Sequence, residues 1–317
     1  MNLEQIAFGP VPSRRLGRSL GINNIPPKIC SYSCVYCQLG RTIKMQVNRR
    51  AFHDSEEILK DAQEKVERAR EMGESVDYVT FVPDGEPTLD INLGREIELL
   101  RALGIKIAVI TNASLIWQPD VRYDLMGADW VSLKLDSVQE EIWRRINRPE
   151  GTLRLHSILD GMLEFASAYR GDLTTETMLV RHFNDGDDQV TDVAGLVARL
   201  KPTKAFLSIP TRPPAEKGLQ PPNEEVINSA YQIFSEKVDR VEYLIGYEGN
   251  AFAFTGDAEQ DILGITAVHP MREDAVREFL AKAKTDWSVV EKLVTQGQLI
   301  RTEYEGRYFY MRKLHGM

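Results

Sequence analysis

The sequence of 317 residues contains only three cysteines, and all of them lie within one stretch of eight residues. An odd number of crowded cysteines does not suit a disulfide framework, which needs pairs at suitable separations. No run of eighteen apolar residues is present, so the sequence predicts no membrane span. The first residues lack the charged-then-apolar layout of a signal peptide. Unpaired cysteines without an export signal favour a cytoplasmic location, where thiols stay reduced.

Several common catalytic motifs are also missing from the sequence. There is no Walker phosphate-binding loop and no His-Glu-x-x-His zinc motif. The serines, histidines and aspartates show no Ser-His-Asp order of a hydrolase triad. These absences argue against a P-loop nucleotide hydrolase, a zinc protease of that type and a serine hydrolase.

The three cysteines form one short motif, Cys30-Ser-Tyr-Ser-Cys34-Val-Tyr-Cys37. Three thiolates cannot complete a tetrahedral zinc site without a fourth ligand, and the nearest histidine is His53. Three cysteines do suit a [4Fe–4S] cluster in which one iron keeps an open position for a non-protein ligand. The residues alone therefore leave three interpretations open: an iron–sulfur cluster, part of a zinc site, or three buried structural thiols.

Positive charge is concentrated at the start of the chain, around these cysteines. The whole chain has a net charge of −8, but residues 1–50 carry eight basic side chains against one acid, Glu4. That segment is at +7, so the remaining residues are at −15. The basic segment is expected to balance an anionic cluster or to meet an anionic substrate. An ordinary solvated basic face is the alternative.

The spacing Cys-x3-Cys-x-aromatic-Cys, with Tyr36 as the aromatic residue, resembles the signature of the radical SAM superfamily. The resemblance implies that Cys30, Cys34 and Cys37 hold three irons of a [4Fe–4S] cluster. S-adenosylmethionine (SAM) is then expected to bind the fourth iron through its amino and carboxylate groups. The resemblance also implies reductive cleavage of SAM to a 5′-deoxyadenosyl radical that abstracts hydrogen from a substrate. Electrons are expected from a donor such as flavodoxin or ferredoxin.

The sequence on either side of the cysteines narrows this resemblance. Val11-Pro-Ser-Arg-Arg-Leu-Gly-Arg-Ser-Leu-Gly-Ile before them and Cys37-Gln-Leu-Gly after them resemble one bacterial and archaeal branch, loosely related to tRNA wyosine-base synthases. The wyosine enzymes continue differently after the last cysteine, and this chain has no cysteines for a second cluster. The substrate is therefore left open, with peptide, protein and RNA as candidates. The alternatives are a tRNA base-modifying enzyme, a redox-sensing nucleic-acid-binding regulator and a zinc-stabilised adaptor.

Hydrophobic periodicity predicts an α/β fold with strands and helices in alternation. Strands are expected at residues 19–25, 78–82, 105–110, 130–135, 174–180 and 204–209, with a further short one at 241–245. Helices are expected at 55–72, 93–103, 119–126, 138–146, 152–169, 188–200 and 223–238. Alternation implies parallel pairing with right-handed crossovers. Six repeats fit a partial (β/α)6 barrel, which the resemblance also implies, and a doubly wound open sheet is the alternative.

Two segments rich in proline or glycine are expected to be loops. The first part of residues 8–23 contains two prolines and is expected to form a fixed turn or loop before the cysteines. Residues 210–222 contain five prolines and are expected to be stiff and extended. This second loop follows the sixth predicted strand, and it is expected to form a rim or lid, or else an inert surface loop.

The chain is expected to divide into three parts: a radical SAM partial barrel over 1–246, a linker packing on the barrel over 247–269, and a small domain over 270–317. Helices at 271–283 and 287–295, followed by strands at 299–304 and 307–312, resemble a winged helix-turn-helix. Residues 271–317 hold nine basic and seven acidic side chains, a weak footprint for a DNA reader. Docking of a protein, peptide or tRNA substrate, or interdomain packing, is expected instead.

Polar residues at the predicted strand ends are the candidates for binding SAM, because the carboxyl ends of parallel strands share one rim. Gly85 and Glu86 resemble the family segment that holds the amino group of the methionine moiety, and a plain turn is the alternative. A cation at the rim can pair with the SAM carboxylate, and an acid or amide can bond its ribose. The alternative for Lys134 and Asp136 is an internal ion pair. The remaining candidates are Tyr36, Asn112, Lys134, Asp136, Glu176, Arg181 and Ser208.

Overall fold

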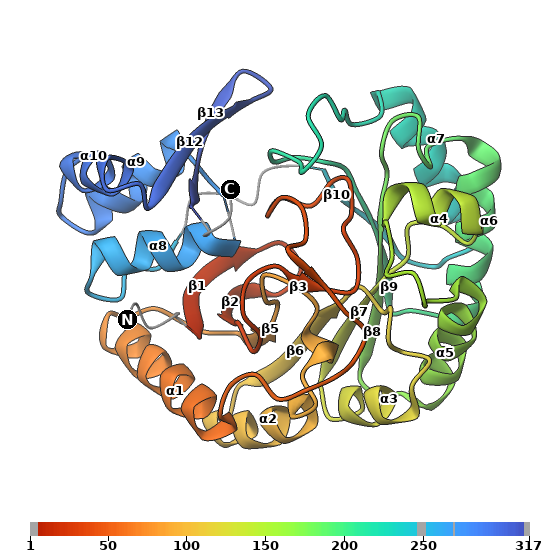
Figure 1. The fold of residues 1–317 in the computed structure, drawn as a ribbon, viewed down its shortest axis with the longest axis horizontal. Coiled ribbons are helices and arrows are strands. Elements are labelled where there is room, and N and C mark those ends of the chain that lie inside the picture. The colour runs from red at the N-terminus through yellow and green to blue at the C-terminus, as the bar shows by residue number, and fades with distance from the viewer. Residues whose placement is uncertain (1–5, 246–251, 269, 314–317) are drawn as a thin grey trace.

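The computed structural model describes residues 6–245, 252–268 and 270–313, and its largest element is an eight-stranded sheet. The sheet curls into a half-barrel with helices on its outer face (Figure 1). The strand order is β1-β2-β5-β6-β7-β8-β9-β10, and every neighbouring pair from β2 onwards is parallel. The predicted α/β partial barrel is confirmed. Among the described residues, no helix is both long and apolar enough to cross a bilayer.

The predicted strands and helices of the barrel are found within a few residues of their expected bounds. The predicted strands are β2 (Gly17–Ile22), β5 (Tyr78–Phe81), β6 (Lys106–Thr111), β7 (Trp130–Lys134), β8 (Asp172–Met178), β9 (Lys204–Ser208) and β10 (Val241–Leu244), and the sheet has one further strand, β1 (Ala7–Ser13). The helices are α1 (Ser55–Glu71), α2 (Leu93–Leu100), α3 (Pro119–Leu125), α4 (Glu140–Ile146), α5 (Leu155–Ala168), α6 (Asp187–Leu200) and α7 (Glu224–Ser235). Short 3-10 turns lie at Pro87–Leu89 and Arg101–Leu103.

Helix α1 shows how local sequence sets these bounds. The Asp54 side chain accepts a hydrogen bond from Glu56 N (2.8 Å), which caps the first turn. Apolar residues recur at helical spacing on one face, including Ile58 and Val66, and they are buried against the sheet. Gly73 follows the helix with φ +73°, a left-handed conformation that glycine adopts without strain.

Strand β1 overturns the expectation of a loop before the cysteines. It pairs antiparallel with β2 at the edge of the sheet, and the register shifts between Phe8 and Val11. Its prolines suggested a loop because proline cannot donate to a β-ladder. An edge strand leaves one row of backbone groups outside the ladder, so prolines and an irregular register are tolerated there. Edge position depends on tertiary structure, which the local sequence pattern did not reveal.

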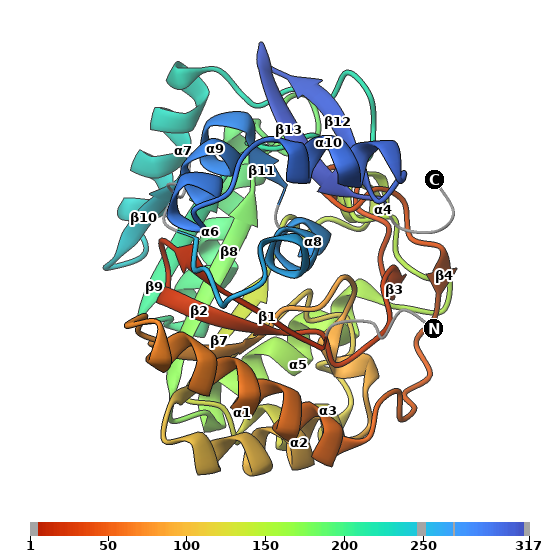
Figure 2. The same ribbon diagram turned by 90° about the vertical axis from the view of Figure 1, so that its left-hand side faces the viewer.

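Helix α8 (Ala258–Val268) lies within the segment expected to be a linker packing on the barrel, and it is a regular helix that contacts β1. Most of its apolar residues are buried, among them Ile262, Leu263 and Ile265. It lies between β1 and the C-terminal elements (Figure 2), so it is covered on more than one side. A helix that is apolar around most of its circumference shows no single-sided periodicity, which explains why the sequence pattern missed it. Residues 247–251 and 269 of the predicted linker lie outside the described residues, as does residue 246 at the end of the predicted barrel.

The C-terminal elements pack around a core of their own. They comprise β11 (Met271–Arg272), α9 (Glu273–Lys282), α10 (Ser288–Thr295), β12 (Leu299–Tyr304) and β13 (Arg307–Arg312). Phe279, Leu293 and Tyr310 belong to this core together with residues of α8. The two predicted helices and the hairpin are present, with a short strand at the start of the first helix. A winged helix-turn-helix identity and the three-part division of the chain remain predictions.

Buried and partly buried ion pairs fasten these elements to the barrel. Lys65 of α1 lies 3.5 Å from Asp261 of α8, and both side chains are almost fully buried. Glu74 pairs with Arg18 of β2 through one oxygen and with Lys282 of α9 through the other. The Lys65–Asp261 and Glu74–Lys282 pairs join the barrel to α8 and α9, so the C-terminal elements have a fixed place beside the sheet.

Candidate functional site

Cys30 ends the short strand β3 (Ile29–Cys30), and Cys34 and Cys37 follow on the loop that leads to the parallel strand β4 (Lys44–Met45); we call residues 30–37 the cysteine loop. Backbone hydrogen bonds fasten this cysteine loop to two other parts of the barrel. Val35 N donates to the carbonyl of Ile146 at the end of α4 (2.9 Å). Glu86 N, just after β5, donates to the carbonyl of Ile29 (3.2 Å). The loop is therefore held over the carboxyl ends of the strands, where binding residues of a βα scaffold gather.

The sulfur atoms of Cys30 and Cys34 accept hydrogen bonds from the chain. The Sγ of Cys30 lies 3.5 Å from both Tyr32 N and Asn112 Nδ2, and the Sγ of Cys34 lies 3.4 Å from Asn147 Nδ2. Burial raises the pKa of both thiols, that of Cys34 to about 12, so both are protonated when no metal is bound. Metal binding would release these protons, and the N–H donors would then stabilise the thiolates.

Cys37 lies close to positive charge. Burial raises the pKa of its thiol, while a hydrogen bond from the backbone N–H of Leu39 and the charges of Lys134 and Lys28 act against that rise. Within the part of the chain that the structure describes, no three His, Cys, Asp or Glu side chains converge on one metal ion. That result concerns one ion, whereas a cluster takes each thiolate on a different iron. Three thiols with N–H donors and neighbouring lysines fit the ligand chemistry of an iron–sulfur cluster.

The Gly85–Glu86 segment packs directly beneath the cysteine loop. A Cβ atom on Gly85 would lie 1.9 Å from the carbonyl oxygen of Ile29, so a larger residue does not fit. Glu86 is 1% exposed, and its carboxylate is occupied within the chain. Its four hydrogen bonds come from Thr88 N, Thr88 Oγ1, Thr111 Oγ1 and Asn112 N. The carboxylate thus ties the end of β6 to the turn after β5.

A cavity of about 270 Å³ lies between Cys37 and the carboxyl ends of β7, β8 and β9; we call it the cysteine cavity. Four of the predicted SAM contacts line it: Tyr36, Lys134, Glu176 and Ser208. Arginine side chains that the sequence did not single out line it as well: Arg14, Arg15 and Arg212. The cavity therefore joins the third cysteine to polar and charged groups from several strands.

Glu176 is the centre of an ion-pair network on the wall of this cavity. Its Oε1 accepts from Lys134 Nζ (3.1 Å) and Ser208 Oγ (3.0 Å), and its Oε2 pairs with Arg15. Burial raises the pKa of Glu176, but the charges of Lys134 and Arg15 outweigh it and hold the pKa at about 2. Burial lowers the pKa of Lys134, and Glu176 and Asp136 outweigh that effect and raise it. Lys134 thus forms an internal ion pair, with Glu176 as its hydrogen-bonded partner.

We expect Glu176→Gln to lower the free energy of unfolding by about 3 kcal/mol at pH 7, because the substitution leaves two cations without their buried carboxylate. A lowered pKa in the folded state stabilises the protein above the ordinary value near 4.5, and this contribution is lost as the pH falls towards 2. The variant should therefore lose stability at pH 7 and less at pH 3. Denaturant titrations at both values measure this.

The matched control is Glu242→Gln on β10. Glu242 pairs with Lys204 of β9 at 2.7 Å, but its side chain is 51% exposed. Exposed pairs contribute about 0–1 kcal/mol, so this variant should unfold nearly like the wild type. Equal losses in the two variants would contradict the central role of the Glu176 network.

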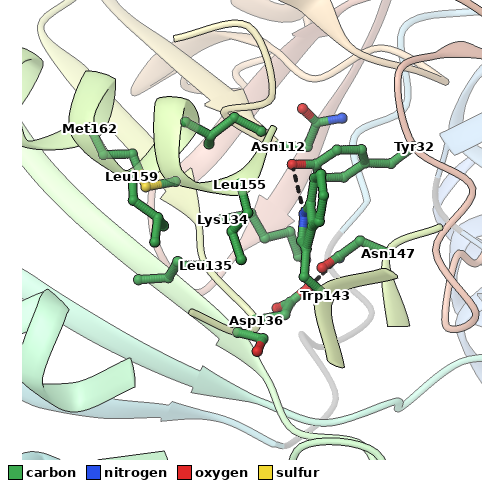
Figure 3. A pocket seen from close by; sticks show the side chains of 12 residues that line it. Tyr32, Asn112, Lys134, Leu135, Asp136, Trp143, Asn147, Leu155, Leu159 and Met162 are labelled. Atoms are coloured by element: carbon green, nitrogen blue, oxygen red, sulfur yellow. Dashed lines mark hydrogen bonds between the residues drawn. The ribbon is translucent and has the colours of Figure 1, made fainter. Parts of the chain in front are cut away.

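A second space, much smaller, lies beside Asp136 and Lys134 (Figure 3). Its volume is about 10 Å³, which is room for about one water molecule. The Oδ2 of Asp136 accepts hydrogen bonds from Asn147 Nδ2 (2.7 Å) and from the hydroxyl of Tyr36. Asp136 therefore positions Asn147, which donates to the sulfur of Cys34. Asn112 also lines this space, next to the cysteine loop.

Three predicted contacts line neither space: Gly85 and Glu86, which lie beneath the cysteine loop, and Arg181. Arg181 points away from the barrel. Its side chain is exposed, and Nη1 donates to Gln220 Oε1 (3.0 Å). Strand β8 ends at Met178, two residues before its predicted end. Residues after Met178 no longer follow the strand, so Arg181 turns towards the proline-rich loop and not into the barrel.

Sequence reasoning missed several residues that the structure brings to the site. Arg14 and Arg15 belong to the basic segment whose charge was noticed, but their position on the cavity wall depends on β1 and β2 pairing at the edge. Arg212 belongs to the proline-rich loop that was expected to form a rim or lid. Asn147 follows a helix, so the rule of strand ends could not find it.

Comparison with known proteins places this geometry in a family. Residues 24–194 match the family model of the radical SAM superfamily. A UPF0026 protein of Methanocaldococcus jannaschii is 49% identical over 98% of this chain and 96% of its own length. The structure of TYW1 with a lysine-pyruvate adduct bound covers 70% of this chain and 74% of its own, with 16% identity and a TM-score of 0.50. Streptococcus suis SuiB bound to S-adenosylmethionine covers 70% and 49%, with 12% identity and a TM-score of 0.52.

The half-barrel fold is thus shared with a class of proteins that, in general, use SAM and an iron–sulfur cluster, and the residues that match the family model include the cysteine loop. This chain belongs to the radical SAM superfamily. Within it, the chain is similar to the UPF0026 proteins over nearly its whole length. The family resemblance expected from the cysteine motif is confirmed.

Proposed function

We propose that this protein is a radical SAM enzyme in which Cys30, Cys34 and Cys37 hold a [4Fe–4S] cluster. The observation that carries the proposal is the cysteine loop itself: three thiols, hydrogen-bonded at their sulfurs, beside a polar cavity at the strand ends. When bound, the cluster and SAM supply reductive cleavage of SAM to methionine and a 5′-deoxyadenosyl radical that abstracts hydrogen from a substrate. The protein orients these groups and limits side reactions.

The amide groups of Asn112 and Asn147 would act on the cysteine thiolates. Their Nδ2 atoms donate to Cys30 and Cys34, and Asp136 and Ser31 hold the two amides in place. Hydrogen bonds to ligand sulfurs stabilise negative charge and so favour the reduced form of a cluster. These two residues would therefore help to set the potential at which the site accepts an electron.

The residues of the cysteine cavity would hold SAM. Lys134 offers a cation for the methionine carboxylate, and Glu176 and Ser208 offer oxygen atoms for ribose hydroxyls. Tyr36 would contact the nucleoside. The Gly85–Glu86 segment packs under the loop, and the Glu86 side chain is buried. The segment would therefore contribute to SAM binding through its backbone groups and by holding Asn112 in position.

The test is anaerobic reconstitution of the whole chain with iron and sulfide, followed by dithionite and SAM. We expect close to four iron atoms per chain, based on the cluster type, and formation of 5′-deoxyadenosine. Zinc in place of iron, or an iron–sulfur protein that leaves SAM intact, would overturn the proposal. Liquid chromatography of the nucleoside products gives the readout.

An electron donor would dock where the cysteine loop reaches the surface. Strand β4 pairs with β3, so Met45 lies opposite Cys30 in the register. Ile43 and Met45 are 59% and 39% exposed, and the exposed basic residues Arg41 and Lys44 lie among them. Basic side chains around apolar ones suit an acidic partner, such as flavodoxin or ferredoxin.

We expect Lys44→Glu to slow reduction of the reconstituted protein by reduced flavodoxin about tenfold at low ionic strength, because it places like charge at the docking surface. Reduction by dithionite, a small reagent, should keep its rate. Stopped-flow absorbance measures both. The control is Lys60→Glu on the outer helix α1, which makes the same charge change away from the cysteine loop. Equal slowing by both variants, or by neither, would contradict this docking surface.

A further inference from the structure

Another cavity, of about 360 Å³, lies between the β12–β13 hairpin and the segment after β9; we call it the hairpin cavity. Residues 209–211 line both this cavity and the cysteine cavity. The hydroxyl of Tyr304 donates to the carbonyl of Pro210 (3.2 Å), which fastens the hairpin to that segment. Figure 1 shows the hairpin beside the loops at this end of the barrel. Residues 209–211 therefore form a boundary that the two cavities share.

Cationic side chains outnumber carboxylates in the lining of both cavities. Four cationic side chains and one carboxylate line the cysteine cavity: Arg14, Arg15, Lys134, Arg212 and Glu176. Two arginines and one carboxylate line the hairpin cavity: Arg272, Arg307 and Glu305. The chain as a whole has a net charge of −8, so this concentration is opposite in sign to the rest of the molecule. Walls of one sign concentrate ligands of the other sign.

The cofactors of the proposed function do not account for the charge at the hairpin. Lys134, which would pair with the SAM carboxylate, lines the cysteine cavity together with Cys37. Among the described residues that line the hairpin cavity there is no cysteine. Arg272 is held by Asp274 through its Nε (2.9 Å), whereas the exposed Arg307 begins β13 at the tip of the hairpin. Its guanidinium is the group best placed to receive an additional anion.

The size of the hairpin cavity indicates what kind of anion it would take. Small-molecule sites in proteins occupy about 300–1,000 Å³, and this cavity lies at the lower end of that range. The C-terminal segment 271–317 has nine basic and seven acidic side chains, too few in excess for a nucleic-acid footprint. The planar guanidinium group binds carboxylates and phosphates through two parallel hydrogen bonds.

We propose that the hairpin cavity binds the anionic group, a carboxylate or a phosphate, of a small substrate whose reacting carbon lies in the cysteine cavity. Arg307 is the residue that contacts this group, and the negative charge of Glu305 weakens its binding. The reaction at the other end of the substrate rests on the proposed function, whereas the anion site is measurable by binding alone. The two ideas can therefore fail separately.

The test is calorimetric titration of the reconstituted holoprotein with inorganic phosphate and, separately, with succinate at fixed ionic strength. We expect saturable binding of at least one anion, and the tighter one assigns the group. Arg307→Gln should weaken that binding at least tenfold, because it removes the charged fork. Glu305→Gln should tighten it about threefold, because it removes a like charge. Misfolding would weaken anion binding, so it cannot explain an increase in affinity.

The control is Arg312→Gln, at the other end of β13 and outside the lining of both cavities, which should bind as the wild type does. No saturable binding of either anion, or equal binding by wild type and Arg307→Gln, would overturn the proposal. Anion binding in a protein that fails to cleave SAM would instead contradict the proposed reaction and still support the anion site. SAM cleavage without anion binding would support the proposed reaction and contradict the anion site.

Discussion

Replacing Cys34 by alanine is expected to abolish formation of 5′-deoxyadenosine, a loss of at least about 10³-fold, because removing a metal ligand removes the site of electron transfer. Cys34 is the middle cysteine of the motif, and its sulfur accepts a hydrogen bond from Asn147. Without it, two thiols remain, too few to hold a cluster with one open iron. Iron content after reconstitution should fall together with the characteristic absorbance.

The control for this variant is Ser33→Ala, next to Cys34 on the same loop. Ser33 Oγ accepts a hydrogen bond from Thr42 N (3.2 Å), so its loss should cost about 1 kcal/mol of stability and leave the iron content unchanged. The two metal-free variants should unfold within a few degrees of the metal-free wild type. Full SAM cleavage by Cys34→Ala, or equal iron loss in both variants, would refute the assignment of Cys34 as a ligand.

Local sequence patterns predicted those residues of the site whose positions depend on motif spacing or on the ends of parallel strands. The cysteine spacing placed the three thiols, and the strand-end rule placed Lys134, Glu176 and Ser208 on one cavity wall. Both rest on regularities of the chain itself: motif spacing, and the convergence of parallel strands at one rim. The alternating strands and helices of the barrel follow from the same kind of periodicity.

The parts that sequence reasoning missed depend on contacts between distant segments. Strand β1 contains Pro10 and is stable only as the edge partner of β2, and α8 is buried on several sides by elements far from it in sequence. Arg15 reaches Glu176 across 161 positions, which no local pattern indicates. Glu86 was expected to face a ligand, yet the structure buries it as a brace between β5 and β6.

Buried polar groups around the loop share one task, which is to fix the cysteines before any cofactor binds. Asp136 holds Asn147, and Glu86 holds the backbone of Asn112; each of these amides in turn donates to a cysteine sulfur. Because each carboxylate is buried, it forms these bonds without competition from water. A preorganised loop of this kind would lose little entropy on binding the proposed cluster.

Gly85→Ala is expected to damage both stability and metal uptake, because the segment under the cysteine loop has no room for a methyl group. The added Cβ would lie 1.9 Å from the carbonyl oxygen of Ile29 and 2.8 Å from the Cδ1 of Ile25. The nearest atom is backbone, so relief requires the loop to move. Overpacking costs about 1–3 kcal/mol where side chains can adjust, and we expect about 3 kcal/mol or more.

The matched control is Gly195→Ala in helix α6. Apart from its chain neighbours and the backbone of the same helix, no atom lies within 4 Å of a Cβ added there, and alanine is the better helix former, so this variant should be more stable by about 0.5–1 kcal/mol. Denaturant titration gives the two stabilities, and iron per folded chain after reconstitution shows whether the cysteine loop has moved. If Gly85→Ala kept full stability and took up iron normally, the close approach of the two segments would be wrong. If it lost stability alone, Gly85 would serve the fold without positioning the ligands.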